Sequence, residues 1–175
     1  AAERLRRCYE LAPPRVQQYL AAEIAYAGDC VQGAGAVLEL GCGYGRVTSQ
    51  LAGVARYVVG IDTAADSVRL ACREARPDSR VAYAVMDAAR LGFAAGSFAA
   101  VVCVQNGIAV FEAEPAAVFA EALRVLRPGG VALFSTYDAR FWPHRLDWFE
   151  RQARAGLVGP IDHERTSGGT IVCQD

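Results

Sequence analysis

The stretch V-L-E-L-G-C-G-Y-G-R-V-T, residues 37–48, decides the fold of this chain. It begins with a short apolar run, as expected for a parallel strand that is covered on both faces. Gly41, Gly43 and Gly45 then alternate over a turn. Because glycine has no Cβ, such a turn can take positive φ and a ligand can approach its backbone closely. We expect a helix over residues 46–51 to present its free N–H groups toward that ligand.

The spacing of these glycines argues against two common nucleotide sites. In the dinucleotide fingerprint G-x-G-x-x-G the third glycine would stand where this chain has Arg46. The G-K-[ST] sequence of a phosphate-binding P-loop is also absent. Glu39, just before the turn, would repel a pyrophosphate, but it suits a cationic ligand without phosphate. S-adenosylmethionine (SAM) has a sulfonium, an amino group, a ribose and an adenine, and it fits this description.

The motif E-L-G-C-G-Y-G resembles the first motif of class I SAM-dependent methyltransferases, written E/D-x-G-x-G-x-G, of the type that acts on small molecules. Further segments follow in the order that the family has. They are V-V-G-I-D (58–62), V-M-D-A-A-R-L (85–91), F-A-A-V-V-C-V-Q-N-G (98–107) and L-R-V-L-R-P-G-G-V-A-L-F-S (123–135). Ordered motifs along the chain are a much more specific signal than one glycine-rich turn.

The resemblance implies an α/β fold. We expect a Rossmann-like, doubly wound, mostly parallel sheet of strand order 3-2-1-4-5, with strands 6 and 7 incomplete and helices on both faces. The expected strands are 36–40, 57–61, 80–85, 98–104, 131–136 and a sixth at 170–174, and the expected helices are 15–27, 46–51, 66–75 (ended by Pro77), 115–126 and 142–155.

By length the chain is expected to be a single SAM-binding domain, 1–175. Within it we expect an N-terminal helical cap (1–30), a core (36–136) and an acceptor-side segment (137–175). That last segment stops before a seventh strand, so we expect the protein to continue beyond Asp175.

Asp62 is the expected ribose-binding residue. It follows an apolar strand and lies 21 residues after Gly41, where nucleotide-binding βαβ units place an acid that binds ribose. The alternative is an N-cap for the next helix, for which Asp66 is better placed. By resemblance, Thr63 would flank the adenosine.

On the adenine side, the resemblance implies that Asp87 accepts a hydrogen bond from the adenine amino group. Met86 or Ala88 would cover the ring, and a polarizable thioether suits that position. The alternative for Asp87 is a solvated turn residue.

The resemblance also gives roles to residues near the methionine end of SAM. It places Glu39 near the amino group, although a helix-cap partner is an alternative. The backbone of Cys42 and of Tyr44 is expected to line the site. Arg46 either holds the SAM carboxylate or caps the loop, and the sequence leaves this open.

Two further positions complete the expected cofactor site. Gln105 and Asn106 follow the fourth strand, and ligands of open α/β sheets bind outside the carboxyl ends of the strands. Tyr9 resembles an N-terminal tyrosine that many small-molecule members fold over the methionine end, and a packing aromatic residue is an equal alternative.

The sequence does not identify a catalytic residue. Tyr137, His144 and Tyr9 are candidates, and Trp142 and His163 also lie in the region where acceptor pockets are built. A histidine there would serve as a general base, whereas surface or cap roles are the alternatives. The motif [DN]-P-P-[YF] is replaced by Q-N-G-I after the fourth strand, which argues against methylation of DNA or of protein amides.

The amino-acid composition argues against several classes of binding partner. The net charge of −1 comes with no basic stripe, which disfavours nucleic acid, and no apolar run approaches a membrane span. The six cysteines form no C-x-x-C pair, so we expect no metal site and reduced thiols in a cytoplasmic protein. We therefore expect a SAM-dependent methyltransferase (EC 2.1.1.-) that releases S-adenosylhomocysteine and acts on a small-molecule acceptor. The alternatives are a non-catalytic SAM-binding or partner-binding domain, an NAD-dependent oxidoreductase and an RNA methyltransferase.

Overall fold

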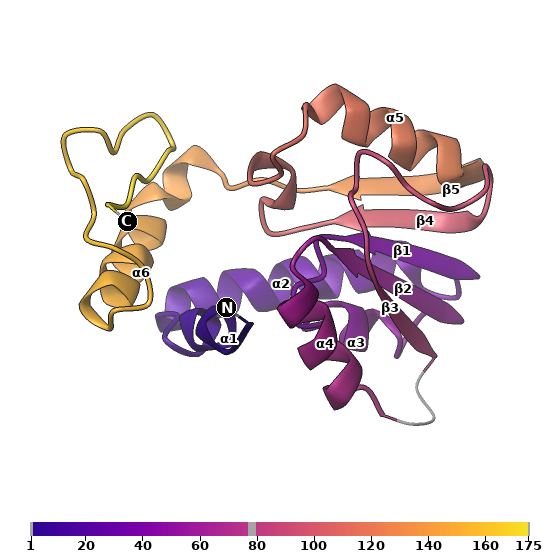
Figure 1. Cartoon of the computed structure of the whole chain (residues 1–175), viewed down its shortest axis with the longest axis horizontal. Coiled ribbons are helices and arrows are strands. Elements are labelled where there is room, and N and C mark those ends of the chain that lie inside the picture. The colour runs from indigo at the N-terminus through magenta and orange to yellow at the C-terminus, as the bar shows by residue number, and fades with distance from the viewer. Residues whose placement is uncertain (1, 77–79, 175) are drawn as a thin grey trace. The chain divides into compact units, whose positions relative to one another are not determined.

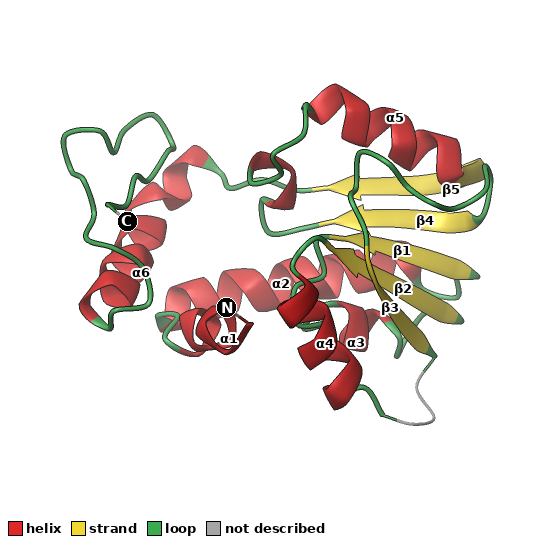
Figure 2. Cartoon of the chain, in the orientation of Figure 1, coloured by secondary structure: helices red, strands yellow, loops and turns green. Residues whose placement is uncertain are grey.

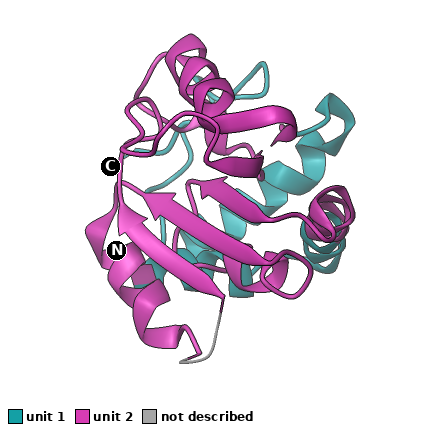
Figure 3. Ribbon diagram, turned by 90° about the vertical axis from the view of Figure 1, so that its right-hand side faces the viewer, with its two compact units in different colours: residues 1, 3–21, 137–175 teal, residues 2, 22–136 magenta. Residues whose placement is uncertain are grey.

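The structure is a computed structural model that describes residues 2–76 and 80–174 (Figure 1). Contacts within the chain divide it into two compact units, shown in separate colours in Figure 3. Unit 1 consists of residues 1, 3–21 and 137–175, and unit 2 consists of residues 2 and 22–136. The single domain expected from length therefore stays a prediction, and each unit is described by itself.

Unit 2 is built around a sheet of five parallel strands in the order β3-β2-β1-β4-β5 (Figure 2). This confirms the predicted fold class and strand order. The strands are β1 (Ala36–Leu40), β2 (Tyr57–Asp62), β3 (Val81–Val85), β4 (Phe98–Cys103) and β5 (Leu126–Phe134).

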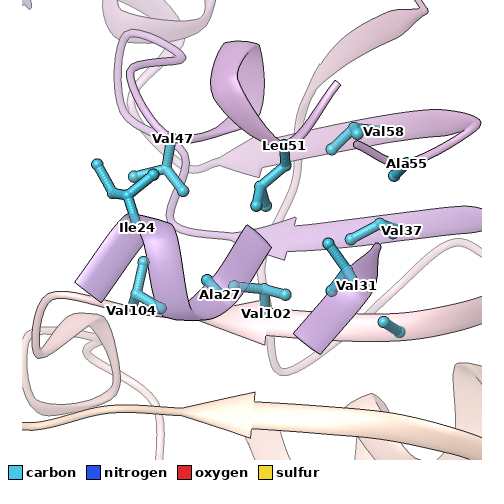
Figure 4. Close-up of a cluster of buried hydrophobic side chains, with 11 residues drawn as sticks. Ile24, Ala27, Val31, Val37, Val47, Leu51, Ala55, Val58, Val102 and Val104 are labelled. Atoms are coloured by element: carbon cyan, nitrogen blue, oxygen red, sulfur yellow. The ribbon is translucent and has the colours of Figure 1, made fainter. Parts of the chain in front are cut away.

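One face of this sheet packs against α2 (Pro14–Val31) and α3 (Thr48–Leu51). Figure 4 shows Ile24, Ala27 and Leu51 meeting valines of β1, β2 and β4 in a buried cluster. The period of two along a strand turns neighbouring residues to opposite faces, so Val37 belongs to this cluster and Leu38 to the other.

The opposite face packs against α5 (Pro115–Val125) through residues such as Val118, Ala122 and Val125. Leu38 and Leu40 of β1 are fully buried there. Helices on both faces, as predicted, explain why β4 is apolar along its whole length and why β1 is apolar except at Glu39. The remaining long helix of unit 2, α4 (Ala65–Glu74), contacts β2 and β3.

Two elements begin two or more residues away from their predicted starts, and α2 ends at Val31 instead of residue 27. The helix expected over 46–51 begins only at Thr48, because a turn closed by a hydrogen bond from the Gly45 amide to the Cys42 carbonyl (2.9 Å) precedes it. It spans four residues, too short for the helix-terminus site that we expected. β5 begins at Leu126 rather than 131, because the R-P-G-G segment forms an irregularity in the strand instead of a break. Pro77, the expected end of α4, lies outside the described residues.

Unit 1 contains most of α1 (Ala2–Glu10), the first part of α2, the short helix η2 (Ala139–Phe141) and α6 (Trp142–Arg154). Its core consists of Val16, Leu20 and neighbouring aromatic residues. The indole N–H of Trp148 donates to the Cys8 carbonyl at 2.8 Å, so α6 is joined to α1 by a buried hydrogen bond as well as by packing.

The sixth strand expected at 170–174 was wrong. The segment pairs with its own neighbourhood through isolated bridges, Ile161 with Cys173 and Ser167 with Thr170. Gly168 and Gly169 take φ of 58° and 88°, which reverses the chain too tightly for an extended strand. Among the helices that the structure describes, none is long and apolar enough to cross a membrane.

Candidate cofactor-binding site

The glycine-rich turn after β1 has the predicted conformation. Gly41, Gly43 and Gly45 take φ of 74°, 54° and 83°, a region that side chains disfavour. The amides of Gly41 and Cys42 both donate to the carbonyl of Ile61 in β2, at 2.8 and 2.9 Å. The turn is therefore fastened to the neighbouring strand at the carboxyl edge of the sheet.

Close packing is a second reason for glycine in this region. A Cβ on Gly45 would lie 2.8 Å from Cζ of Tyr83, and one on Gly41 would lie 3.0 Å from the ring of Phe111. Gly60 in β2 is equally restricted, since a Cβ there would lie 2.8 Å from Cβ of Cys42. The glycines thus serve the internal packing of unit 2 as well as the geometry of the turn.

Asp62, at the end of β2, connects the turn to the next helix. One carboxylate oxygen accepts a hydrogen bond from the Gly43 amide at 2.9 Å, and the other accepts from the Ala64 amide at 2.8 Å. A carboxylate has about four lone-pair sites, so capacity for ribose hydroxyls remains. The suggestion of Asp66 as an N-cap was wrong, because Ala64 is the N-cap of α4 and Asp66 pairs with Arg69 at 2.5 Å.

Asp87 lies at the same edge as Asp62, because β2 and β3 are adjacent parallel strands. One oxygen of Asp87 accepts from the Ala89 amide at 2.8 Å, and the other lies 3.7 Å from Nε of Arg90. This is the local bonding of a turn residue, yet the side chain is 42% exposed and so remains open to a ligand. Its role toward adenine stays a prediction.

The other expected nucleoside contacts differ in exposure. Met86 is half-buried and its sulfur accepts from the Gly92 amide at 3.4 Å. Ala88 is buried in the apolar cluster on the α5 side of the sheet, and Thr63 is exposed. Of the two residues expected to cover the adenine ring, Met86 is the more accessible.

Glu39 is buried and accepts a hydrogen bond from the Thr48 hydroxyl at the start of α3. Burial raises the pKa of Glu39 to about 7, against the opposing effects of the Thr48 hydrogen bond and of the positive charge of Arg46. This contact joins Glu39 to the first residue of α3, whose N-cap is Val47, and both the helix-cap alternative and a role near the SAM amino group stay predictions.

The two residues between the glycines differ in their surroundings. Cys42 is buried, and burial raises the pKa of its thiol, so it is a packing residue and not a nucleophile. Tyr44 is half-buried. A backbone contribution of either residue to the site stays a prediction.

A second left-handed turn follows β4. Gln105 and Asn106 have φ of 59° and 61°. Among the residues that the structure describes, no other non-glycine residue has positive φ. The Gln105 amide donates to Glu23 at 3.1 Å and to the Ser135 hydroxyl at 3.0 Å, and that hydroxyl in turn donates to Glu23. Arg46 donates to the side-chain oxygen of Gln105. The structure thus joins the two turns through Arg46 and Gln105.

Sequence reasoning missed Glu23 and Ser135. A signal for Glu23 existed, because it lies three residues after Leu20 and four before Ala27, which places a carboxylate on the buried face of α2. Ser135 directly follows β5, at the same edge of the sheet as the other strand ends.

Two buried polar atoms at this turn have no hydrogen-bond partner among the described residues. They are one carboxylate oxygen of Glu23 and the side-chain nitrogen of Gln105. Leaving such groups unpaired is costly, so they indicate a missing partner. The amino-acid end of SAM carries both a donor and an acceptor. With the cation of Arg46 and the two acids at the ends of β2 and β3, the residues present fit SAM.

The tyrosine and histidine candidates lie in unit 1. The ring of Tyr9 is 5.6 Å from that of Trp148, and the ring of Tyr137 is 6.1 Å from that of Phe141. His144 is exposed, with its ring 5.3 Å from Phe141. These contacts are those of packing aromatic residues, and a part in catalysis stays a prediction for each.

The remaining candidates of this region are also in unit 1. Trp142, the first residue of α6, is half-buried, and His163 is exposed. Within residues 2–76 and 80–174, no group of three or more His, Cys, Asp or Glu side chains is arranged to hold a metal ion.

Comparison with known proteins agrees with this geometry. Residues 37–130 match the methyltransferase domain family. The chain is 32% identical to the 2-methyl-6-phytyl-1,4-hydroquinone methyltransferase of Synechocystis sp., over 89% of this chain and 55% of that protein. It therefore spans about half the length of this curated relative.

Solved structures share the fold. The PH0226 protein of Pyrococcus horikoshii OT3 is similar with a TM-score of 0.68 and 26% identity, over 87% of this chain and 67% of that one. An S-adenosylmethionine-dependent methyltransferase from Mesorhizobium loti gives 0.54 and 30%, over 61% and 48%. With more than half of its residues in the family match, and with the sheet order and glycine turn described above, this chain belongs to the class I SAM-dependent methyltransferase family.

Proposed function

We propose that unit 2 binds SAM across the carboxyl ends of β1, β2, β3 and β4, and that the protein transfers its methyl group to a small-molecule acceptor. The observation that carries this proposal is the left-handed glycine turn joined to Asp62 by the Gly43 amide. This arrangement presents bare backbone and a carboxylate side by side, as an adenosine ligand requires. Support for a small-molecule acceptor comes from the Synechocystis relative, whose name specifies a hydroquinone.

The proposal gives each cluster one task. Asp62 accepts hydrogen bonds from the ribose, and Asp87 accepts one from the adenine amino group. At the other end, the free oxygen of Glu23 and the side-chain nitrogen of Gln105 pair with the ammonium and carboxylate groups, with Arg46 adding positive charge. The ribose hydroxyls, the adenine amino group, the ammonium and the carboxylate then each meet a group of opposite hydrogen-bonding character.

Catalysis is proposed to proceed mainly by alignment. When bound, SAM supplies an electrophilic methyl group on a positively charged sulfur, so the chain has to hold the acceptor in line with the sulfur–carbon bond. Alignment alone can contribute roughly 7–11 kcal/mol to lowering a barrier. A base is needed only for an acceptor that must lose a proton, and Tyr9, Tyr137 and His144 remain the proposed candidates.

We also propose a cytoplasmic location. Five cysteines carry free thiols in the structure, as is usual where glutathione and thioredoxin keep thiols reduced: Cys8, Cys30, Cys42, Cys72 and Cys103.

The test is calorimetry with SAM and with S-adenosylhomocysteine on the full chain. We expect both to bind, and Asp62→Ala to weaken binding at least tenfold, because it removes the ribose acceptor. Asp66→Ala is the matched control, since Asp66 is an exposed acid of α4 that pairs with Arg69. Absence of binding to either compound, or equal affinities of the two variants, would refute the proposal.

The acceptor is tested separately. Methyl transfer is measured from labelled SAM to a panel of hydroquinones and unrelated phenols. We expect transfer to at least one small aromatic acceptor. Tight SAM binding without transfer to any small molecule would contradict the small-molecule part of the proposal and leave the cofactor part intact.

A further inference from the structure

Arg145 of α6 has an unusual environment within unit 1. Its guanidinium carbon lies 4.8 Å from the ring centroid of Tyr137, 5.8 Å from that of Phe149 and 6.0 Å from that of Trp142. The side chain is half-buried. Aromatic faces attract a cation at such distances, so three rings enclose this positive charge.

The polar contacts of Arg145 do not balance its charge. One terminal nitrogen donates to the Gly169 carbonyl at 2.6 Å, and the Nε–H is buried without a hydrogen-bond partner. In the described part of the chain, no carboxylate lies within ion-pair distance of Arg145. Arg151, on the same helix, is paired with Asp147 at 3.1 Å.

Arg145 cannot become neutral by losing a proton. Burial lowers the pKa of Arg145, but a guanidinium stays protonated at any physiological pH. A half-buried charge without a counter-charge is unfavourable, and its free energy falls when an anion is supplied. No described residue supplies one, so we look for it in a ligand.

We propose that Arg145 is the anion-binding residue of a ligand site in unit 1 that accepts an aromatic carboxylate. The planar guanidinium matches the two oxygens of a carboxylate, and the half-buried rings of Trp142 and Phe149 offer apolar surface to the ring of the ligand. The site includes Tyr137 and Trp142, which lie where the acceptor of the proposed methyl transfer is expected, but binding of a carboxylate to Arg145 requires no SAM.

The first experiment compares two probes on the unmodified full chain. Benzoate carries the proposed carboxylate, and benzyl alcohol is its uncharged analogue. Both tryptophans of the chain, Trp142 and Trp148, lie in unit 1, so tryptophan fluorescence reports on this unit, and calorimetry gives the affinities. We expect benzoate to bind at least tenfold more tightly. Absence of benzoate binding, or equal affinities, would overturn the proposal.

The second experiment uses variants whose fold is checked by circular dichroism. Arg145→Gln should weaken benzoate binding at least tenfold, and Arg145→Lys should have an intermediate effect, because it keeps the charge and loses the planar fork. Arg151→Gln is the matched control and should bind benzoate as the unmodified chain does. Equal binding by Arg145→Gln and Arg151→Gln overturns the proposal. If Arg145→Gln does not fold, Arg145→Lys decides: unchanged benzoate affinity overturns the proposal.

Inorganic phosphate serves as the competing anion. We expect it to displace benzoate only weakly, since it lacks an aromatic ring. Tighter binding of phosphate than of benzoate would overturn the assignment to an aromatic carboxylate. SAM titrations on the same variants keep this result distinct from the cofactor proposal.

Discussion

The turn after β1 and the turn after β4 reach left-handed backbone in opposite ways. The first uses Gly41, Gly43 and Gly45, for which positive φ carries little strain, and Gly41 and Gly45 also leave room for the rings of Phe111 and Tyr83. The second uses Gln105 and Asn106, which also have positive φ. This conformation costs on the order of 1–3 kcal/mol for most non-glycine residues and less for asparagine. The difference teaches that the first turn allows close packing of its backbone, whereas the second holds side chains in position.

We expect the largest effect on stability at Gly45, in the first turn. Gly45→Ala should lower the free energy of unfolding by about 3–4 kcal/mol, because the new methyl group needs positive φ and clashes with Tyr83. Gly33→Ala is the matched control, since Gly33 has φ of 71° and nothing within 4 Å of the added Cβ. We expect about 1 kcal/mol there, measured by urea denaturation. Equal losses would show that packing against Tyr83 does not matter.

The pH dependence of stability tests Glu39, the buried acid just before the first turn. The folded state holds the Glu39 proton more tightly than the unfolded chain does, because burial raises its pKa from 4.5 to about 7. Protonated Glu39 therefore favours folding at low pH, and this contribution, about 3 kcal/mol, is lost as the pH rises from 4.5 through 7.

Glu39→Gln removes this group from the titration, so the fall in stability over that range should become shallower than in the unmodified chain. Denaturation at several pH values measures it. Parallel pH profiles for the two proteins would mean that Glu39 keeps an ordinary pKa.

A substitution at Glu23 tests whether the second turn depends on the hydrogen bonds that Glu23 accepts from Gln105 and Ser135. Glu23→Gln keeps the size of the side chain and removes the charged acceptor for Gln105 and Ser135, so we expect a loss of stability of about 1–2 kcal/mol. If the turn holds the amino-acid end of SAM, SAM affinity should fall as well, about tenfold. Asp29→Asn, an exposed acid-to-amide change on the same helix, should alter neither quantity. Identical results for the two variants would remove Glu23 from the site.

The smallest expected effect separates strain from function. Asn106→Gly relieves a positive φ and should raise the free energy of unfolding by at most about 1 kcal/mol. SAM affinity should not rise with it, because the more flexible turn must be ordered on binding. Thermal denaturation and calorimetry measure the two quantities. A stability loss would show that the asparagine side chain, and not the backbone, matters most here.

Sequence alone predicted the part of this site that depends on local pattern. The alternating glycines, the apolar strand before them and Asp62 at the end of β2 all follow from residues close together in the chain. The Gln105 amide donates hydrogen bonds to Glu23, which lies 82 residues earlier in the chain, and to Ser135, which lies 30 residues later. Such pairings depend on how strands and helices assemble, which no local period records.

The wrong expectations have the same origin. The run T-I-V-C-Q at 170–174 has the composition of a strand, but the preceding glycine pair turns it back on its own segment. The short α3 reflects turn hydrogen bonds among residues 42–49, which helix propensity does not describe.

The hydrogen bond from the Gly43 amide to Asp62 gives this protein a natural reporter. Hydrogen–deuterium exchange at that single amide should change when a ligand binds to the same carboxylate and covers the turn. Exchange at Gly33, an amide bonded to the carbonyl of Val54, supplies an internal reference in the same spectrum. Occupancy of the adenosine site can thus be followed without a label, a known acceptor or any turnover.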